Sequence, residues 1–259
     1  MLPKRGTSAN PENRFERIHV DCEEPAAPSP TRLFRDRSRS ILAENDSPDI
    51  GFRYSVNPYR GCEHGCIYCY ARPSHEYLGF SAGLDFERNL LVKENAPELL
   101  RATFAAPRWQ PQLIALSGNT DCYQPIERTL GVTRRCLEVF VEFRNPMAII
   151  TKGALVARDA DLLAELAACG AASVRVSLTS LDPEVARRME PRASRPDRRL
   201  DAIATLARAG VPVGVMVAPV VPGLNDEEIP AILAAAADAG AVSASWILLR
   251  LPKPVDALF

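Results

Sequence analysis

Short apolar runs alternate along the chain with longer stretches in which apolar residues recur at helical spacing. The apolar runs have the length and the β-branched content of buried strands. They occupy 53–57, 112–117, 147–151, 173–178, 212–217 and 244–249. The helical stretches between and after them occupy 95–105, 125–143, 159–169, 183–189 with 197–209, and 226–239. This alternation predicts parallel strands joined by right-handed helical crossovers.

Cap residues support these helix boundaries. Gly170, Gly210 and Gly240 each follow a helical stretch, where a left-handed C-terminal cap is common. Asp182 and Asn225 occur at the positions expected for N-caps. We therefore predict the α/β class, with a partial (β/α)6 TIM-like barrel of parallel strands as the architecture. An open, doubly wound sheet fits the same order of elements.

Polar residues follow several of the predicted strands. In both architectures the carboxyl ends of the strands meet at one face, and chemistry is placed there. We therefore expect these separate segments to gather at one site. The segments are Ser117 to Asp121, Thr151-Lys152, Thr179-Ser180 and Pro222 to Asn225.

The chain divides into two regions of different character. Residues 1–47 mix charges with Pro25, Pro28 and Pro30, which predicts an irregular N-terminal extension. Residues 48–259 carry the regular pattern and form one core domain. Val255 to Phe259 resembles the first turn of a helix without its end, so we expect the domain to be truncated after its sixth strand.

Composition excludes several classes of protein. Apolar residues make up 47% and charged residues 24%, which is typical of a globular chain and excludes a mostly disordered one. The net charge of −1 argues against a globally basic nucleic-acid binder. The sequence has no secretory signal and no apolar stretch of about 18 residues, so we expect a cytoplasmic protein with no membrane partner.

Three of the seven cysteines stand close together, as Cys62, Cys66 and Cys69. An odd total excludes complete internal disulfide pairing, and this clustering indicates metal chemistry in a reducing compartment. The spacing C-x3-C-x2-C lets a compact loop direct three thiolates toward one centre. Gly61 and Gly65 permit the tight backbone turns that such a loop needs.

Three interpretations of this loop are open. A [4Fe–4S] cluster usually takes four cysteines, so three would leave one iron open for another ligand. A structural zinc site needs a fourth ligand, which His64 or His75 could supply. A dithiol redox pair would use only Cys66 and Cys69 and leaves Cys62 unexplained. The loop favours the cluster over zinc, and zinc over the redox pair.

The loop and its surroundings resemble the radical S-adenosylmethionine (radical SAM) superfamily. The motif follows the first strand of a (β/α)6 pattern, and an aromatic residue, Tyr68, precedes the last cysteine. The run Tyr68-Cys69-Tyr70 is similar to the spore photoproduct lyase-like branch. Further segments resemble an uncharacterised bacterial subfamily of that branch, namely Asn57 to Tyr77, Thr120-Asp121, Thr151-Lys152 and Glu190 to Ala193.

The resemblance implies an activity and two cofactors. In the superfamily, a reduced [4Fe–4S] cluster cleaves bound S-adenosylmethionine, and the resulting 5′-deoxyadenosyl radical abstracts hydrogen from a substrate. It therefore implies a radical SAM enzyme with an unknown substrate and with a reducing electron donor such as a flavodoxin or ferredoxin. The competing hypothesis is a non-catalytic module that binds zinc or nucleic acid and uses the same cysteines structurally.

The resemblance also implies roles for individual residues. The three cysteines would be the iron ligands. The other roles follow by position: Tyr68 and Tyr70 beside the cluster and the adenine, Thr120 at the amino end of S-adenosylmethionine, Lys152 at its carboxylate, Ser177 at the ribose, and Ala218 to Val220 flanking the adenine. The ordinary alternatives are core packing for the tyrosines, turn or cap roles for the hydroxyl residues, and a solvated cation for the lysine.

One departure from the branch concerns its hydrogen-donating cysteine, which follows the second strand. Gly118 aligns best with that position here. Cys122 is the candidate catalytic thiol in its place, and a buried inert thiol is the alternative. Cys22, Cys136 and Cys169 are interpreted as structural or incidental.

Basic and imidazole side chains near the expected site leave further alternatives. Six arginines follow the fourth strand, at positions 187, 188, 192, 195, 198 and 199, and a second basic run spans Arg32 to Arg39. They form either a solvated face paired with acids or contacts to a phosphorylated or nucleic-acid partner. His64 and His75 flank the cysteine loop, where they either make loop hydrogen bonds or tune the metal centre.

Overall fold

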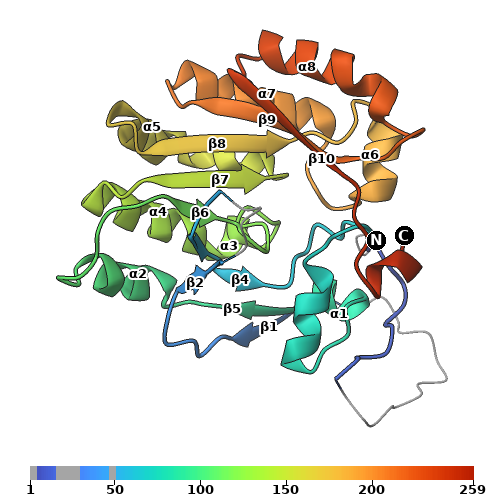
Figure 1. Ribbon diagram of the computed structural model, residues 1–259, viewed down its shortest axis with the longest axis horizontal. Helices are drawn as coiled ribbons and strands as arrows, with labels where there is room; N and C mark the ends of the chain where they lie inside the picture. The colour runs from blue at the N-terminus through green and yellow to red at the C-terminus, as the bar shows by residue number, and fades with distance from the viewer. Residues whose placement is uncertain (1–4, 16–29, 47–50) are drawn as a thin grey trace.

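A seven-stranded sheet forms the centre of the molecule (Figure 1), in a computed structural model that describes residues 5–15, 30–46 and 51–259. The strand order is β10-β9-β8-β7-β6-β3-β2. Six strands pair in parallel: β3 (Tyr54–Val56), β6 (Ile114–Leu116), β7 (Met147–Thr151), β8 (Ala172–Ser177), β9 (Val213–Val220) and β10 (Ser243–Leu248). They match the six predicted strands. The predicted α/β class and partial barrel are therefore confirmed, and within the described residues the sheet stays open.

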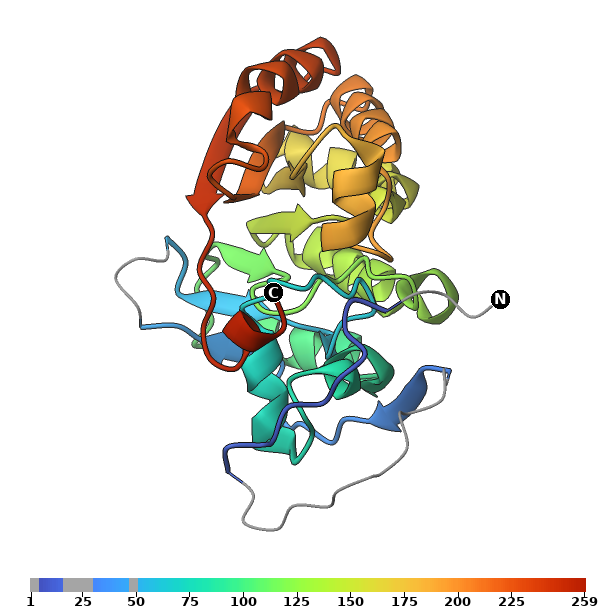
Figure 2. The same cartoon turned by 90° about the vertical axis from the view of Figure 1, so that its right-hand side faces the viewer.

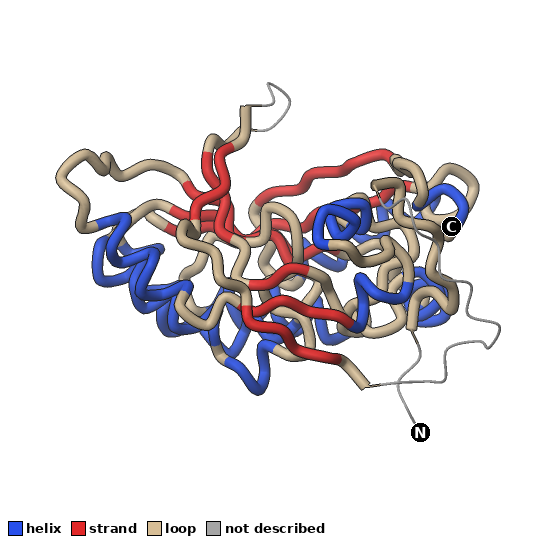
Figure 3. Tube along the Cα trace, turned by 90° about the horizontal axis from the view of Figure 1, so that it is seen from below, coloured by secondary structure: helices blue, strands red, loops and turns tan. Residues whose placement is uncertain are grey.

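Helices follow the strands and line one face of the sheet (Figure 3). The longer ones are α2 (Ala96–Phe104), α4 (Val132–Phe143), α5 (Ala160–Ala168), α7 (Pro196–Arg208) and α8 (Ile229–Asp238). Consecutive members of this series contact one another. The buried core lies between them and the sheet, where Val174 and Val176 of β8 meet Leu163, Ile203 and Leu206. Burial of these apolar side chains is the main stabilising contribution to this layer.

Two predicted helices differ from the observed ones. The stretch 125–143 is divided into α3 (Glu127–Leu130) and α4, because Gly131 between them has φ +63 and interrupts the right-handed helix. The stretch 226–239 begins as a 3-10 turn, η3 (Asp226–Glu228), before α8. The short helix α6 (Pro183–Met189) has the predicted bounds.

Of the two predicted N-cap residues, one caps its helix and the other does not. Asp182 caps α6 as expected, because its carboxylate accepts hydrogen bonds from the amides of Glu184 and Val185. Asn225 precedes η3 but makes no capping bond. Its side-chain amide instead donates to the carbonyls of Thr179 and Pro219, so it ties two strand-end loops together.

The face of the sheet away from these helices carries mostly short side chains, with Ile150, Arg175 and Met216 as longer ones. Successive residues of a strand point to opposite faces, so Arg175 and Ser177 face away from Val174 and Val176. The register places Arg175 between Ile150 of β7 and Gly214 of β9. By the same register, this face also carries Ser55, Ala115, Ala148, Ser173 and Ser243. We call it the open face.

The predicted irregular extension contributes two strands, so that expectation is wrong for these residues. β1 (Arg32–Arg35) pairs with β5 (Asn89–Val92), which pairs with β4 (Tyr59–Arg60) to give a separate three-stranded sheet. β2 (Leu42–Glu44) extends the edge of the main sheet and runs antiparallel to β3. Strands of two to four residues are too short for an alternating pattern to stand out. Cys22, Pro25 and Pro28 lie outside the described residues.

Short turns complete the structure around these sheets. They are η1 (Arg72–Leu78), α1 (Leu84–Arg88), η2 (Ala154–Asp159) and η4 (Val255–Ala257). The segment after β10 runs down to η4, which both Figure 1 and Figure 2 place near η1 and α1. Along this path Leu249 and Leu251 pack against Cys66 and Tyr68. No helix in the described ranges is long and apolar enough to cross a membrane.

Candidate functional site

The cysteines lie on a loop that links β4 to η1, residues 61–70, which we call the cysteine loop. Gly61 has φ +81 and Gly65 has φ +69, so both adopt the left-handed conformation that the sequence predicted for tight turns. A Cβ atom at position 61 would also lie only 2.9 Å from the carbonyl oxygen of Phe86. Glycine is therefore required there both for backbone conformation and for space.

The three thiols of the cysteine loop are free. Burial raises the pKa of Cys62, and the negative charges of Asp121 and of the other two thiols raise it further. Burial also raises the pKa of Cys66 and of Cys69. A thiolate ligand must be deprotonated, so in this environment its formation requires the positive charge of a bound metal centre.

The arrangement of the donors distinguishes a cluster from a single ion. Within the described ranges, no three His, Cys, Asp or Glu side chains are grouped so as to hold one metal ion. The imidazoles considered as a fourth zinc ligand are engaged elsewhere, His64 with Asp121 and His75 with the carbonyl oxygen of Asn89. Three free thiols spread over one loop fit a cluster in which each of three irons takes one thiolate.

A buried arginine fixes the shape of the cysteine loop. Arg72 donates from Nε to the carbonyl oxygen of Cys66 at 2.9 Å and from Nη2 to Glu87 at 2.6 Å. The carboxylate of Glu87 also accepts hydrogen bonds from the amides of Gly6 and Thr7. The N-terminal segment therefore lies directly against the cysteine loop through one shared carboxylate.

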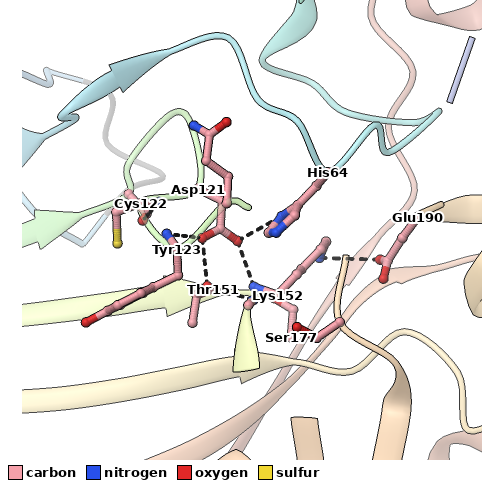
Figure 4. A network of polar contacts seen from close by, with 12 residues as sticks. His64, Asp121, Cys122, Tyr123, Thr151, Lys152, Ser177 and Glu190 are labelled. Carbon is pink, nitrogen blue, oxygen red and sulfur yellow. Dashed lines mark hydrogen bonds and ion pairs between the residues drawn. The ribbon is translucent and has the colours of Figure 1, made fainter. Parts of the chain in front are cut away.

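Asp121 joins three strand-end loops through its carboxylate (Figure 4). It accepts hydrogen bonds from the Thr151 hydroxyl and from the backbone amide of Lys152, both at 2.7 Å, and lies 3.3 Å from Nδ1 of His64. Burial alone would raise the pKa of Asp121, but His64 and these hydrogen bonds outweigh it and lower the pKa to about 2. The ionised aspartate thus holds the cysteine loop against the ends of β6 and β7.

Glu190 forms a second buried centre beside Lys152. Its carboxylate accepts hydrogen bonds from the hydroxyls of Tyr68 and Thr179 and pairs with Arg199, and Nζ of Lys152 lies 3.6 Å away. Burial raises the pKa of Glu190, but Arg199 and Lys152 outweigh it and lower the pKa to about 2. Nζ of Lys152 also donates to the carbonyl oxygen of Ala218 at 3.2 Å. The predicted residues Tyr68, Lys152 and Ala218 are therefore brought together.

A family model for the radical SAM superfamily matches residues 56–236, and this range contains the cysteine loop, Lys152 and Glu190. The chain belongs to the radical SAM superfamily. Enzymes of this family use a [4Fe–4S] cluster and S-adenosylmethionine, so the predicted cofactors are confirmed.

Two relatives support this membership at the level of sequence. The chain is 42% identical over 204 residues to the uncharacterized protein Rv2578c of Mycobacterium tuberculosis, covering 78% of this chain and 60% of that protein. It is 31% identical over 180 residues to the uncharacterized protein MJ0683 of Methanocaldococcus jannaschii, covering 69% of this chain and 64% of that one. The chain thus spans about three fifths of the length of these relatives.

Two solved structures share the fold. A spore photoproduct lyase variant with bound AdoMet and dinucleoside spore photoproduct superposes with a TM-score of 0.64 at 20% identity, covering 87% of this chain and 64% of that one. SuiB of Streptococcus suis bound to S-adenosylmethionine superposes with a TM-score of 0.51 at 14% identity, covering 77% and 39%. The predicted resemblance to the spore photoproduct lyase-like branch of the radical SAM superfamily is confirmed as a likeness of fold.

The other residues predicted to bind S-adenosylmethionine in this radical SAM protein form no side-chain hydrogen bond to Lys152 or Glu190 in the described part of the structure. Tyr70 is 62% exposed, and its hydroxyl donates to the carbonyl oxygen of Gly118 at 3.0 Å. The hydroxyl of Thr120 is buried and donates to the carbonyl oxygen of Tyr59. Ser177 is buried at the end of β8, and its carbonyl oxygen accepts from Arg199. Their roles toward S-adenosylmethionine stay predictions.

The candidate catalytic thiol lies in the main core. Cys122 is fully buried there with Cys136, and in Figure 4 its sulfur points away from the Asp121 carboxylate. A hydrogen-donor role for Cys122 stays a prediction, and this burial favours the alternative of an inert core thiol. The aligned position, Gly118, has no room for a side chain, because a Cβ there would lie 2.6 Å from Cβ of Ser55.

The six arginines after β8 do not form one basic patch. Several pair with nearby acids on the surface: Arg187 and Arg188 with Glu184, Arg195 with Asp197, and Arg198 with Asp201. Arg199 is buried against Glu190, and Arg192 pairs with Glu63 of the cysteine loop. The solvated-face interpretation therefore fits the exposed pairs, while Arg192 and Arg199 belong to the site.

Sequence reasoning treated Arg199 only as one of six arginines, with Glu190 as an acid that could pair with some of them, and did not place either residue in the cofactor site. Glu190 lies at the end of α6, well away from the end of β8, so strand-end position alone does not single it out. The available signal was the segment Glu190 to Ala193, which supported the resemblance without suggesting a function for its first residue.

Proposed function

We propose that this chain is a radical SAM enzyme in which Cys62, Cys66 and Cys69 hold one [4Fe–4S] cluster. The observation that carries the proposal is that the loop with three free thiols lies against Lys152 through Tyr68, at the carboxyl end of the parallel strand β7. When bound, the cluster and S-adenosylmethionine supply a 5′-deoxyadenosyl radical that abstracts hydrogen from a substrate. The chain contributes binding, orientation and the exclusion of water.

Lys152 is the residue that we assign to the carboxylate of S-adenosylmethionine. A compact ammonium group suits a single carboxylate. Its nearest acid, Glu190, is already paired with Arg199, so the charge of Lys152 is only partly compensated and remains available to an incoming anion. Tyr68, bound to the same Glu190, keeps its ring 5.8 Å from Nζ of Lys152.

The other cofactor contacts are proposed by position. Tyr70 would pack beside the cluster and the adenine, Thr120 would meet the amino end of S-adenosylmethionine, and Ser177 would meet the ribose. Ala218 to Val220 would flank the adenine with backbone groups. Support for Ser177 comes from its place on the open face, in register with Met216 of β9.

The proposed substrate is anionic, as a molecule related to nucleic acid would be. Support comes from Arg175, which lies on the open face one step below Ser177 and has no ion pair or hydrogen bond among the described side chains. Its neighbours in register are Ile150 and Gly214, neither of which carries a charge that could pair with the guanidinium. The fold is shared with a lyase bound to a dinucleoside photoproduct, which agrees with such a substrate. The proposal includes a reducing electron donor such as a flavodoxin or ferredoxin and a cytoplasmic location.

The test is anaerobic reconstitution with iron and sulfide, followed by metal analysis and reduction with dithionite. We expect about four irons per chain, a [4Fe–4S] resonance on reduction and release of 5′-deoxyadenosine. Cys66→Ala should abolish the release. The matched control is Cys169→Ala, which removes a thiol that is exposed at the end of α5 and far along the chain from the cysteine loop.

Two results would contradict the proposal. One is stoichiometric zinc in a protein that takes up no iron and sulfide, which is the outcome expected of the non-catalytic module. The other is a Cys66→Ala protein that still releases 5′-deoxyadenosine at the rate of the unaltered chain.

A further inference from the structure

A cavity of about 580 Å³ lies behind the cysteine loop, outside the set of residues proposed for S-adenosylmethionine. It is bounded by His64 of that loop, by the segments around α3 and η2, and by the turn between α6 and α7. Four separate stretches of chain thus converge on one concavity. Its volume is within the range of small-molecule sites.

The charged groups that line this cavity are all basic. They are the guanidinium groups of Arg128, Arg158, Arg192 and Arg198. The remaining lining residues are His64, Tyr123, Pro125, Ala154, Leu155, Ala193 and Ser194, so no carboxylate faces the space.

The acids that balance these arginines lie beneath the lining. Glu127 and Asp159 are fully buried and pair with Arg158, and the buried Glu63 pairs with Arg192. Arg198 pairs with Asp201, which lies in the wall of a neighbouring cavity. Nε, Nη1 and Nη2 of Arg158 all donate to Glu127 or Asp159, so this guanidinium is already satisfied. Arg198 bonds to Asp201 through Nη1 only, which leaves its other nitrogens for a ligand.

Two other guanidinium groups have nitrogen atoms that donate no hydrogen bond within the described residues. Nη1 of Arg192 is buried and lacks a hydrogen-bond partner, although Nη2 bonds to Glu63 at 3.1 Å. Arg128 has no ion pair or side-chain hydrogen bond in the described part of the chain. Nη1 of Arg192 has almost no accessible surface, so the side chain would have to shift before a ligand could bond to it. The exposed Arg128 offers its donors to the cavity directly.

We propose that this cavity binds a small molecule that carries two linked phosphate groups. The planar guanidinium fork matches phosphate oxygens bidentately. Arg128 and Arg198, on two separate stretches of the lining, have donors left for one phosphate each. A second cavity of about 330 Å³ shares Ala154 and Arg198 with the first. Because Asp201 faces that second space, it suits the uncharged part of a ligand, such as the nucleoside of a nucleoside diphosphate.

The concave shape distinguishes this ligand from larger anions. A nucleic acid or an acidic protein would need a basic stripe across an open surface, whereas the neighbouring exposed arginines Arg187, Arg188 and Arg195 are each paired with an acid. The site does not depend on the proposed function, because none of its lining residues is assigned to the cluster or to S-adenosylmethionine. It is nevertheless adjacent to that centre, since His64 lines the cavity and contacts Asp121.

The test is calorimetric titration of the full chain, carrying its reconstituted iron–sulfur centre, with inorganic pyrophosphate at low ionic strength. We expect saturable binding near one pyrophosphate per chain. Arg128→Gln should weaken it by about 10-fold or more, as loss of a charge-assisted hydrogen bond predicts. The matched control is Arg135→Gln, which removes an equally exposed arginine of α4 that does not line the cavity. It should weaken binding less than about twofold.

Titrations with other ligands identify which kind of molecule carries the phosphates. Tighter binding of adenosine diphosphate than of pyrophosphate supports a nucleotide, and equal binding supports a free diphosphate. Absence of saturable binding at about 1 mM pyrophosphate would overturn the proposal. Equal weakening by the two arginine variants, or binding only of duplex DNA or of an acidic protein, would also overturn it. The binding heat needs no turnover, so failure of the proposed radical chemistry would leave this test valid.

Discussion

Lys152 and Glu190 lie 3.6 Å apart, and Arg199 holds the same glutamate from its other side. This arrangement keeps the lysine ammonium beside the cysteine loop while leaving its charge only partly neutralised. This arrangement is the basis on which we propose that Lys152 binds the carboxylate of S-adenosylmethionine.

The first prediction concerns the charge of Lys152. Lys152→Gln should weaken S-adenosylmethionine binding by roughly 10-fold to 100-fold, because a charge-assisted hydrogen bond contributes about 1.5–3 kcal/mol. Iron content should not change, since Lys152 is not an assigned ligand. Equilibrium dialysis with reconstituted protein measures the affinity. Lys152→Arg should recover part of it, and unchanged affinity in the glutamine variant would remove Lys152 from the cofactor site.

The second prediction concerns the buried pair itself. Glu190→Gln leaves the Arg199 guanidinium buried without its counter-charge, so it should lower the free energy of unfolding by about 3–5 kcal/mol. Urea denaturation measures this loss. The double variant Glu190→Gln/Arg199→Gln should lose less than the sum of the two single variants, because it removes both charges together. Strict additivity would show that the two side chains do not act as a pair.

The third prediction concerns His75 and pH. Burial lowers the pKa of His75 from 6.5 to about 4, and its Nδ1 is buried without a partner among the described residues. As pH falls, the unfolded chain therefore takes up this proton before the folded chain does. The contribution of neutral His75 to the free energy of unfolding is therefore fully present above about pH 6.5. It falls by about 3 kcal/mol as the pH is lowered to about 4.

The check compares His75→Gln with the unaltered chain in urea at several pH values. Nε2 of His75 bonds to the carbonyl oxygen of Asn89, and a glutamine amide retains a donor for that bond. The difference in unfolding free energy between the two proteins should shift in favour of the variant as the pH falls. A difference that stays constant between about pH 7 and 4 would show that His75 titrates normally in the fold.

The fourth prediction concerns the contact between the N-terminal segment and the cysteine loop. A Cβ atom on Gly6 would lie 1.6 Å from the carbonyl oxygen of Gly65, so Gly6→Ala should displace the segment. Trypsin should then cleave faster after Arg5 and Arg14, and the reconstituted iron should be lost faster in air. Gly51→Ala is the control, because nothing lies within 4 Å of a Cβ there. Equal cleavage of both variants would contradict the contact.

Much of the core could be predicted from the sequence because local residue patterns mark where individual strands and helices begin and end. The strand Met147–Thr151 and the helix Pro183–Met189 have the predicted bounds, since a continuous apolar run and an Asp-Pro start are local signals. The break at Gly131 was missed because glycine is tolerated inside a helical pattern, and only its positive φ ends α3. The strands β1 and β2 exist through pairing with distant partners, which no local pattern reveals.

In the candidate site, too, local features could be predicted from the sequence and tertiary contacts could not. The spacing of Cys62, Cys66 and Cys69 is a local feature, so the sequence alone indicated a metal centre. The place of Glu190 depends on tertiary contacts with Tyr68, which lies 122 positions earlier, and with Lys152. Such a partner becomes visible only when the chain has folded.

The short side chains of the open face have a consequence for evolution. Ser55, Ala115, Ala148, Ser173 and Gly214 set the floor beneath the strand ends. Exchange of any one for a large apolar residue would change which molecules fit above it, while the cysteine loop and Lys152 would stay in place. If the proposed function holds, single substitutions on this face would change the substrate without altering the residues assigned to the cluster and to S-adenosylmethionine.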